Sequence, residues 1–239
     1  MLLRKETLPK GKTLLRLAGM GAIGYVGQSF SYLTAIKYAS AGLVALLLYL
    51  YPAIVAVLSI LILKEKINKT KIFAITLALA GTALTVSPEG GKPLGIILGI
   101  TAAVIYSFYI IVGTDVMKKV TATQSSTVIF FSASAVYGVL MAANQPHFPA
   151  TAQGWWVIAG TVLVATIIPV ITFLAGLQRI GPTNASMLST LEPVVTVLLA
   201  AILFNERLQP ISLAGGGMII LAVLLLATAE LGKNNTHAN

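Results

Sequence analysis

The sequence has no cysteine, two histidines and only seven acidic residues among its 239 positions. Without cysteine the chain can form no disulfide, no cysteine-ligated zinc site and no thiol nucleophile. His147 and His237 lie in polar stretches that contain proline or asparagine, so a histidine-based metal or catalytic site is not expected. We therefore expect neither a cofactor nor a metal.

Charge is also scarce: 10% of the residues are charged and 57% are hydrophobic, whereas a soluble domain is usually nearer a quarter charged and half apolar. Apolar segments, each near the ~20 residues that span a bilayer, occupy residues 13–35, 41–63, 71–87, 93–113, 124–143, 155–177, 183–204 and 211–229. Within lipid each segment must be a helix, because no water is present to bond the backbone. The sequence predicts an all-α integral membrane protein with eight transmembrane helices.

The net charge of +9 would suit nucleic-acid binding, but the positions of the basic residues argue against that partner. With eight spans the loops alternate between the two sides of the membrane. Of the 16 lysines and arginines, only Lys37, Lys92 and Arg207 fall on the side opposite the N-terminus. The positive-inside rule then places both termini in the cytoplasm. We expect a multi-pass protein of the cytoplasmic (cell) membrane that binds no nucleic acid.

The chain also contains an internal repeat. A shift of 141 residues places Pro52 on Pro193 and Glu65 on Glu206, and it aligns three spans of each copy. Aligned spans start on opposite sides of the membrane, so the repeats are inverted, as in transporters that alternate access around a central site.

The repeat sets the domain organisation. The expected domains are residues 1–87 for the first copy, with three helices, residues 93–229 for the second copy, with five, and a cytoplasmic tail over 230–239. By symmetry two more spans are expected before Met1, which would complete a ten-helix fold of five plus five.

Glu192 is the only charge in the apolar run 185–204. A carboxylate inside a membrane span is costly, so it marks a site for a substrate, an ion or a proton. Ser189 and Thr196 lie on the same helix face and form a polar stripe with it. Burial disfavours the charged form, so Glu192 would act as a proton switch or pair with an ammonium group of a substrate. The competing interpretation is a neutral acid bonded to a backbone carbonyl that Pro193 leaves free.

Other polar-tipped residues are expected to line the same cavity. In span 13–35 Tyr25, Gln28 and Tyr32 share one helix face, which forms either a cavity wall or interhelical hydrogen bonds. Tyr51 is the repeat counterpart of Glu192. The residues expected to bind substrate are Glu192, Tyr51, Tyr25, Gln28, Tyr32, Tyr106 and Ser189.

Pro52 and Pro193 are expected to kink their spans, because each removes one backbone hydrogen bond. The kinks would be either hinges for transport or fixed bends. Glu65 and Glu206 end matching spans beside basic residues and are interpreted as charges at the water interface. Asp115 is expected in a loop.

Two stretches carry a family resemblance. They are the run from Ala39 to Pro52 with Lys64-Glu-Lys66 after the span, and the run Ala185-Ser-Met-Leu-Ser-Thr-Leu-Glu-Pro193 followed by Asn205-Glu-Arg207. Both are similar to the EamA-type branch of the drug/metabolite transporter superfamily, although Asn205 replaces the usual glycine. The resemblance covers nearly the whole chain, without the family's first two helices, and implies a ten-helix carrier of small metabolites or drugs.

The leading hypothesis is a secondary transporter, with export favoured, that alternates access and uses Glu192 either as a proton switch or as a substrate-charge switch. Its expected partners are a small-molecule substrate and the lipid bilayer, and a homodimer is left open. The alternative is a truncated, non-transporting membrane protein that assembles with a partner supplying the missing helices. An intramembrane enzyme would need a second catalytic group near Glu192; the sequence offers none, so we expect no enzyme.

Overall fold

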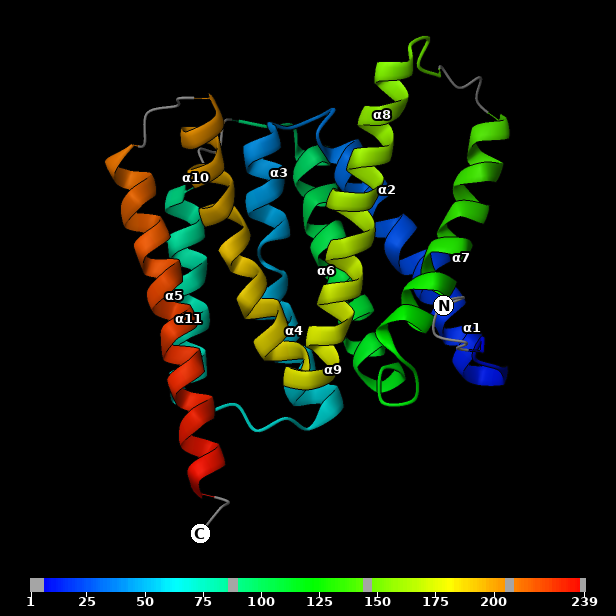
Figure 1. The fold of residues 1–239 in the computed structure, drawn as a ribbon. Helices are drawn as coiled ribbons and strands as arrows, with labels where there is room; N and C mark the ends of the chain where they lie inside the picture. The colour runs from blue at the N-terminus through cyan, green and yellow to red at the C-terminus, as the bar shows by residue number, and fades with distance from the viewer. Residues whose placement is uncertain (1–6, 86–89, 144–147, 205–208, 237–239) are drawn as a thin grey trace. The chain divides into compact units, whose positions relative to one another are not determined.

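The protein is helical in the part of the chain that the structure describes. A computed structural model describes residues 7–85, 90–143, 148–204 and 209–236 (Figure 1). Within these ranges there is no strand, and the one β pairing is an isolated bridge between Ala39 and Gly91. The predicted all-α class is therefore confirmed. His147, Glu206 and His237, which the sequence analysis singled out, lie outside the described residues.

The chain divides into two compact units. The first comprises Met1–Gln28 and Tyr109–Gly181, and the second comprises Ser29–Phe108 and Pro182–Asn239. Each unit thus combines two stretches that are far apart in the sequence.

Five stretches of helix among the described residues are long and apolar enough to cross a membrane. They are Ala41–Leu63, Pro93–Val116, Ala122–Ala143, Ala152–Leu203 and Pro210–Ala229. The fourth has 52 residues and contains two of the expected spans. Its backbone leaves helical geometry at Gly181, whose φ of 77° suits a residue without a Cβ. The protein is therefore a multi-pass membrane protein.

The other two expected spans are helical but fall outside this set. Span 13–35 consists of three consecutive pieces: α1 (Gly11–Gly19), the π-helical η2 (Met20–Tyr25) and α2 (Val26–Ala35). For span 71–87, α5 (Lys69–Thr85) has 17 residues, slightly fewer than the ~20 of a full crossing. The count of eight spans stays a prediction.

The remaining helices are α3 (Ala41–Leu48), α4 (Tyr51–Leu63), α6 (Pro93–Val116), α7 (Ala122–Ala143), α8 (Ala152–Gly160), η3 (Thr161–Ile167), α9 (Ile168–Leu188), η4 (Ser189–Leu191), α10 (Glu192–Phe204) and α11 (Pro210–Thr236).

Local sequence signals explain several helix starts. The hydroxyls of Ser40 and Thr151 each accept a hydrogen bond from the backbone N–H three residues on, at 3.2 Å, which caps α3 and α8. Thr121 and Gln124 form a reciprocal capping box before α7.

Two of the expected spans depart from regular α-helical geometry next to a proline. α3 ends at Leu48 and α4 starts at Tyr51, while the short 3-10 turn η4 precedes Glu192, the start of α10. Pro52 and Pro193 are each the second residue of a helix, where an N–H would have no intrahelical partner. The expected kinks are thus local interruptions, because a proline cannot bond back to the preceding turn.

These irregularities recur at one spacing. Four pairs of elements have first residues that lie 141 residues apart, namely Gly11 and Ala152, Met20 and Thr161, Tyr51 and Glu192, and Lys69 and Pro210. This spacing equals the shift of the expected repeat, and the repeat itself stays a prediction.

In the first unit α1 and η2 pack against α7. A Cβ on Gly21 would lie 2.3 Å from the backbone oxygen of Ile129, so only glycine permits this approach. Nearer the N-terminus, the Arg16 guanidinium pairs with the Asp115 carboxylate at 2.5 Å, and the Lys118 ammonium lies 3.9 Å from it. Asp115 is a residue of α6, not of the loop in which the sequence analysis expected it. Its ion pair with Arg16 connects α6 with α1.

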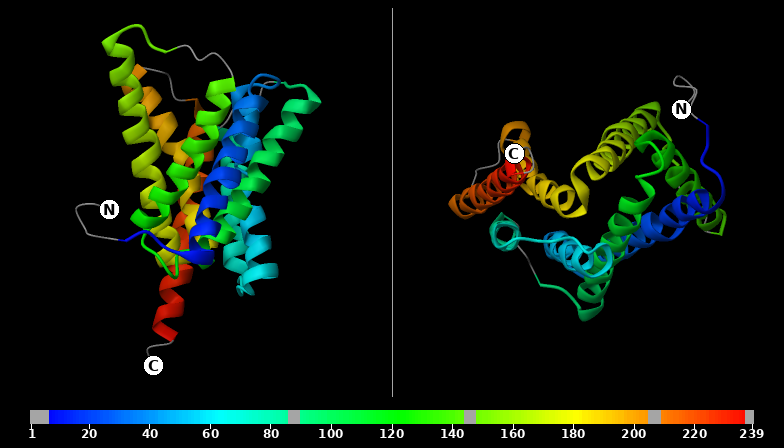
Figure 2. Two further views of the ribbon diagram at one scale, coloured as in Figure 1. Left: turned by 90° about the vertical axis from the view of Figure 1, so that its right-hand side faces the viewer. Right: turned by 90° about the horizontal axis from the view of Figure 1, so that it is seen from below.

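The second unit contains an antiparallel pair of helices, α5 and α11, which lie side by side (Figure 2). Gly81 near the end of α5 faces Gly215 near the start of α11. A Cβ on Gly81 would lie 2.6 Å from the Gly215 oxygen, and a Cβ on Gly215 would lie 2.5 Å from the Gly81 oxygen. Ala74 and Ala222, further along the same two helices, are fully buried in one apolar cluster. Small residues permit this close backbone contact, as is common inside membranes.

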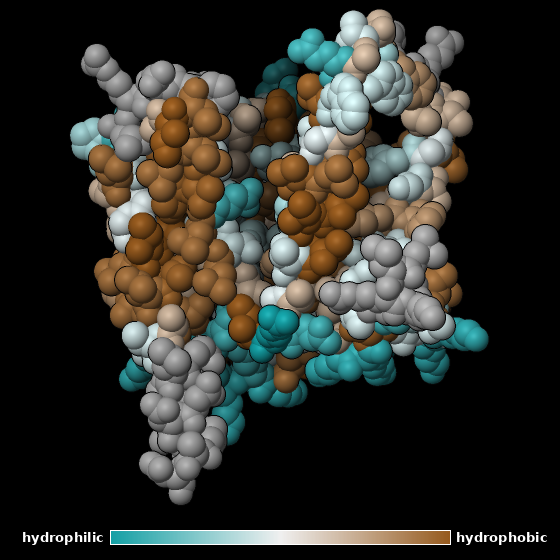
Figure 3. Space-filling view, in the orientation of Figure 1, coloured by the Kyte–Doolittle hydropathy of each residue, from teal (hydrophilic) through white to brown (hydrophobic). Residues whose placement is uncertain are grey.

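Hydrophobic side chains cover most of the coloured part of α10 and α11 in this view (Figure 3). On α10 Leu198 and Ile202 are exposed, and on α11 Leu213 and Leu224 are exposed. Apolar surface of this extent is unfavourable in water, and lipid is the solvent in which it is stable.

Candidate functional site

Five of the residues predicted to bind substrate lie together in the second unit, where α4 and α10 begin. They are Tyr32, Tyr51, Tyr106, Ser189 and Glu192, and they are joined by Tyr49. These six residues form the Glu192 cluster.

The carboxylate of Glu192 is surrounded by tyrosines. Glu192 is the first residue of α10, and the 3-10 turn η4 runs directly into it, since the Glu192 backbone N–H bonds to the Ser189 carbonyl oxygen. The Tyr49 hydroxyl donates a hydrogen bond to the carboxylate, and Tyr32 and Tyr51 interact with it electrostatically. Among the residues that the structure describes, no lysine or arginine forms an ion pair with Glu192. Within the described ranges, the acid therefore has hydroxyl and aromatic neighbours and no cationic partner.

The Glu192 side chain is exposed, whereas the sequence predicted a buried acid. Its tyrosine neighbours therefore cover only part of the side chain. Those neighbours are themselves buried: Tyr49 is 9% exposed and Tyr51 is 3% exposed. A carboxylate that is open on one side can be reached by a solute or an ion.

Tyr51 is held in place by contacts from two other helices. Its hydroxyl donates a hydrogen bond to the carbonyl oxygen of Ser186 in α9 at 3.3 Å. Its ring meets the ring of Tyr106 in α6 edge-on, with centroids 4.8 Å apart and planes at 65°. The Ser107 hydroxyl donates to the carbonyl oxygen of Tyr51 at 3.3 Å. The start of α4 is thus tied to α6 and α9, and the Tyr51 ring has a fixed orientation.

Sequence reasoning missed Tyr49. In a continuous helix, side chains two positions apart point about 200° from each other, so Tyr49 would not be expected beside Tyr51. The turn between α3 and α4 removes that constraint, and both tyrosines are buried. The signal that could have found Tyr49 is the Tyr-Leu-Tyr-Pro sequence, in which two tyrosines precede a proline inside a span.

Two other predicted residues, Tyr25 and Gln28, belong to the first unit. Tyr25 meets Phe130 of α7 edge-on at a centroid distance of 6.1 Å, and its hydroxyl bonds with Thr166 of η3. Gln28 is half-buried. The contacts of Tyr25 join helices, as the interhelical interpretation expects. A role of either residue in binding substrate stays a prediction.

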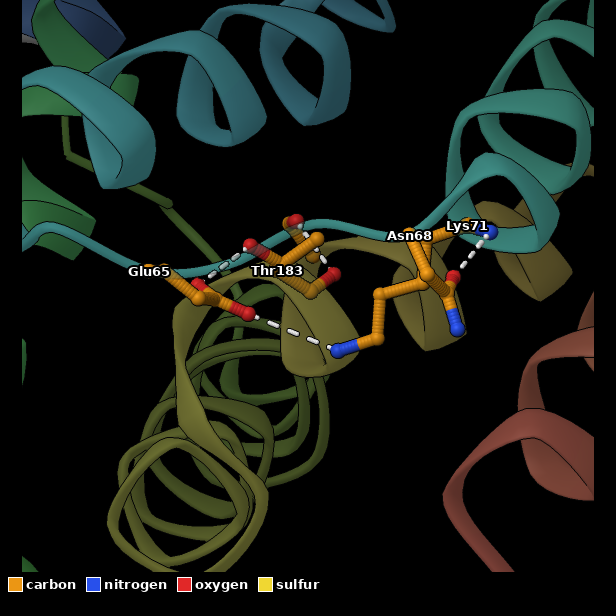
Figure 4. Close-up of polar contacts among 5 residues, drawn as sticks. Glu65, Asn68, Lys71 and Thr183 are labelled. Carbon is orange, nitrogen blue, oxygen red and sulfur yellow. Dashed lines mark hydrogen bonds and ion pairs between the residues drawn. The ribbon is translucent and has the colours of Figure 1, made fainter. Parts of the chain in front are cut away.

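A second polar group lies at the connection between α4 and α5 (Figure 4). The Glu65 carboxylate accepts a hydrogen bond from the Thr183 hydroxyl at 2.8 Å and pairs with the Lys71 ammonium at 3.4 Å. Asn68 accepts a hydrogen bond from the backbone N–H of Lys71 at 2.8 Å and so caps α5. Lys71 is only 2% exposed, so its charge requires partners inside the protein. Glu65 is therefore a partner of a buried lysine, not only the interfacial charge that the sequence analysis expected.

The described residues contain no group of three or more histidine, aspartate or glutamate side chains that could hold a metal ion. The Glu192 cluster instead combines one carboxylate with aromatic rings and hydroxyls. Such a set of groups can bind a small solute through charge, hydrogen bonds and aromatic contact.

Known proteins resemble this chain over most of its length. The EamA-like transporter family matches residues 1–87 and 93–228. An uncharacterized transporter of Archaeoglobus fulgidus is 30% identical over 211 residues, which cover 87% of this chain and 75% of the relative. The uncharacterized transporter YyaM of Bacillus subtilis is 26% identical over 228 residues, covering 91% and 74%. A protein of known crystal structure shares the fold, with a TM-score of 0.83 at 18% identity over 95% of this chain and 80% of that chain. The chain therefore belongs to the EamA-like transporter family and is a multi-pass membrane transporter.

Proposed function

We propose that the protein is a secondary carrier that exports a small organic solute across the cytoplasmic membrane by alternating access. The distribution of lysine and arginine supports an orientation with both termini in the cytoplasm. The sequence contains no ATP-binding P-loop motif, so we assign the driving force to a gradient.

The observation that carries this proposal is the position of the Glu192 cluster at local irregularities of two spans, which are the turn between α3 and α4 and the 3-10 turn η4. In carriers, substrate and coupling-ion sites are commonly formed by discontinuous helices whose ends supply partial charges. Here both spans stay helical, but each departs from regular α-helical geometry at the cluster. Pro52 and Pro193 are the proposed hinges, because their missing N–H groups weaken the connection between the two parts of each span.

An inverted repeat supports alternating access. In this proposal residues 1–87 form one copy and residues 93–229 the other, within a fold of five plus five helices. The four pairs of helix starts at one spacing agree with this division. The equivalent helices α5 and α11 run antiparallel, which is the arrangement expected of inverted copies. If the two copies exchange their conformations, the site would open first to one side of the membrane and then to the other.

We assign to Glu192 the role of a charge switch. Its carboxylate would bind a proton in one half of the cycle and release it in the other, and this would couple solute export to proton entry. A purely structural Glu192 would leave transport independent of the proton gradient.

Proteoliposomes loaded with a pool of amino acids, nucleosides and amines would test the proposal, with efflux followed by mass spectrometry. We expect the protein to accelerate the release of at least one solute, and an inward proton gradient to increase that rate. Glu192→Gln should lower the rate at least about tenfold, the equivalent of ~1.4 kcal/mol, and remove the gradient dependence. Asp115→Asn is the matched control, since it neutralises an exposed acid of the other unit and should keep the wild-type rate.

Two results would contradict the proposal. If Glu192→Gln transports like the wild type and responds to the gradient in the same way, Glu192 is not the switch. If no solute of the pool crosses faster than in protein-free liposomes, the carrier function itself is wrong.

A further inference from the structure

We infer that the Glu192 cluster selects organic cations, meaning solutes with an ammonium group on an aliphatic or aromatic body. This inference rests on the proposed transport function of the same site, and it adds the chemical class of the substrate.

The first argument is charge. A carboxylate inside a membrane protein is stabilised by a positive partner. In the described part of the chain, the ion pairs are Arg16 with Asp115, Lys118 with Asp115, and Lys71 with Glu65. None of these cations forms an ion pair with Glu192, which is itself exposed. An ammonium group of a solute fills that role, whereas an anionic solute would be repelled.

The second argument is the aromatic surroundings. Tyr32, Tyr49 and Tyr51 interact with the Glu192 carboxylate, and Tyr106 lies against Tyr51. Tyr49 and Tyr51 are buried, so the rings that a solute could reach are the half-buried ones of Tyr32 and Tyr106. The face of an aromatic ring attracts a cation, and the attraction grows when the cation leaves water. Rings next to a carboxylate therefore favour a cation through both groups at once, and they also favour an apolar body attached to it.

The third argument is the balance of hydrogen-bond donors and acceptors. The ionised carboxylate of Glu192 can only accept hydrogen bonds, and its donor in the described part of the protein is the Tyr49 hydroxyl. An ammonium group offers only donors, so it complements the acceptor capacity that remains on the carboxylate.

This chemistry also explains how coupling would work. A proton and an organic cation compete for one carboxylate, so the loss of one is linked to the binding of the other. Net exchange then moves a cation outward for each proton that enters.

A set of ligands with the same shape and different charge would test the inference on the purified protein in detergent by calorimetry. The probes are 2-phenylethylammonium, trimethyl(2-phenylethyl)ammonium, neutral 2-phenylethanol and anionic 3-phenylpropionate. Both cations are expected to bind at least tenfold more tightly than the alcohol and the carboxylate. The quaternary probe has a fixed charge, so any weakening of its binding at lower pH reports protonation of the protein.

Variants separate the charge from the rings. Glu192→Gln should weaken cation binding at least tenfold, and Asp115→Asn should leave it unchanged. Tyr32→Leu should weaken the quaternary probe about two- to fivefold, whereas Tyr32→Phe keeps the ring and should stay within about twofold of the wild type. Size-exclusion profiles identical to the wild type are required of each variant before its affinity is compared.

Equal binding of the neutral and cationic probes would overturn the inference, as would wild-type cation affinity in Glu192→Gln. The inference and the proposed function can fail separately. Glu192-dependent transport of a neutral or anionic solute would support the proposed carrier function and contradict the inferred cation selectivity. Selective binding of cations without any transport would support the inferred selectivity and contradict the proposed carrier function.

Discussion

Replacing Gly81 by alanine would test the contact between α5 and α11. The added Cβ would lie 2.6 Å from the carbonyl oxygen of Gly215 and 2.9 Å from Cγ1 of Ile219, well inside the ~3.5–4.0 Å of a favourable contact. Because the nearest atom belongs to the backbone, the two helices must separate by up to about 1 Å, and the packing of Ala78 and Ala222 loosens. Such overpacking costs about 1–3 kcal/mol, and removing a glycine from a helix returns at most about 1 kcal/mol. We expect a net loss of about 1–2 kcal/mol of unfolding free energy.

The matched control is Gly217→Ala on α11, where a Cβ would meet no atom within 4 Å. In thermal unfolding of the purified protein in detergent, Gly81→Ala should lower Tm by about 2–8 °C, since 1 kcal/mol corresponds to about 2–4 °C in a chain of this size. Gly217→Ala should leave Tm unchanged or raise it slightly. Equal Tm values for the two variants would refute the close backbone contact.

Two further predictions concern stability within the second unit. Glu65→Gln removes the charge that pairs with Lys71, and it should cost about 1–3 kcal/mol, less than the ~3–5 kcal/mol of a fully buried pair, because 25% of the Glu65 side chain is exposed. The double variant with Lys71→Met should recover most of that loss in the same melting assay, and an equal loss in both would argue against the pair. Ser40→Ala removes the cap of α3 and should cost about 1 kcal/mol, whereas Ser40→Thr keeps a hydroxyl and should cost clearly less; indistinguishable melting of these two variants would show that the cap contributes nothing.

The general fold could be predicted because lipid imposes it. Segments of ~20 apolar residues must be helices in a bilayer, and the multi-pass helical protein follows from that requirement alone. Where a span divides into pieces could not be predicted in the same way. Pro52 and Pro193 showed which spans would depart from a regular α-helix. A proline in the sequence, however, does not distinguish a kinked helix from one that contains a turn. The π-helical segments left no mark that composition or periodicity could detect.

The candidate site was predictable where one residue stands out chemically. Glu192 is the only acid in its span, and the proposed repeat pairs Tyr51 with it. Tyr49 escaped notice because helix periodicity assigns it to the opposite face. The contact of Glu65 with Thr183 joins residues 118 positions apart, and only tertiary packing brings them together.

The close contact between α5 and α11, called the seam below, limits which substitutions this sequence can accept. In the proposed repeat, Gly81 corresponds to Ala222 and Ala74 corresponds to Gly215, so each helix contributes the same two small positions to one buried contact. Such a contact is isologous, like the interface of a two-fold symmetric dimer, although here both partners belong to one chain. A larger side chain at one position acts on only one end of the seam. It would tilt the two helices apart and break their two-fold relation, and only a second, equivalent substitution would restore the symmetry.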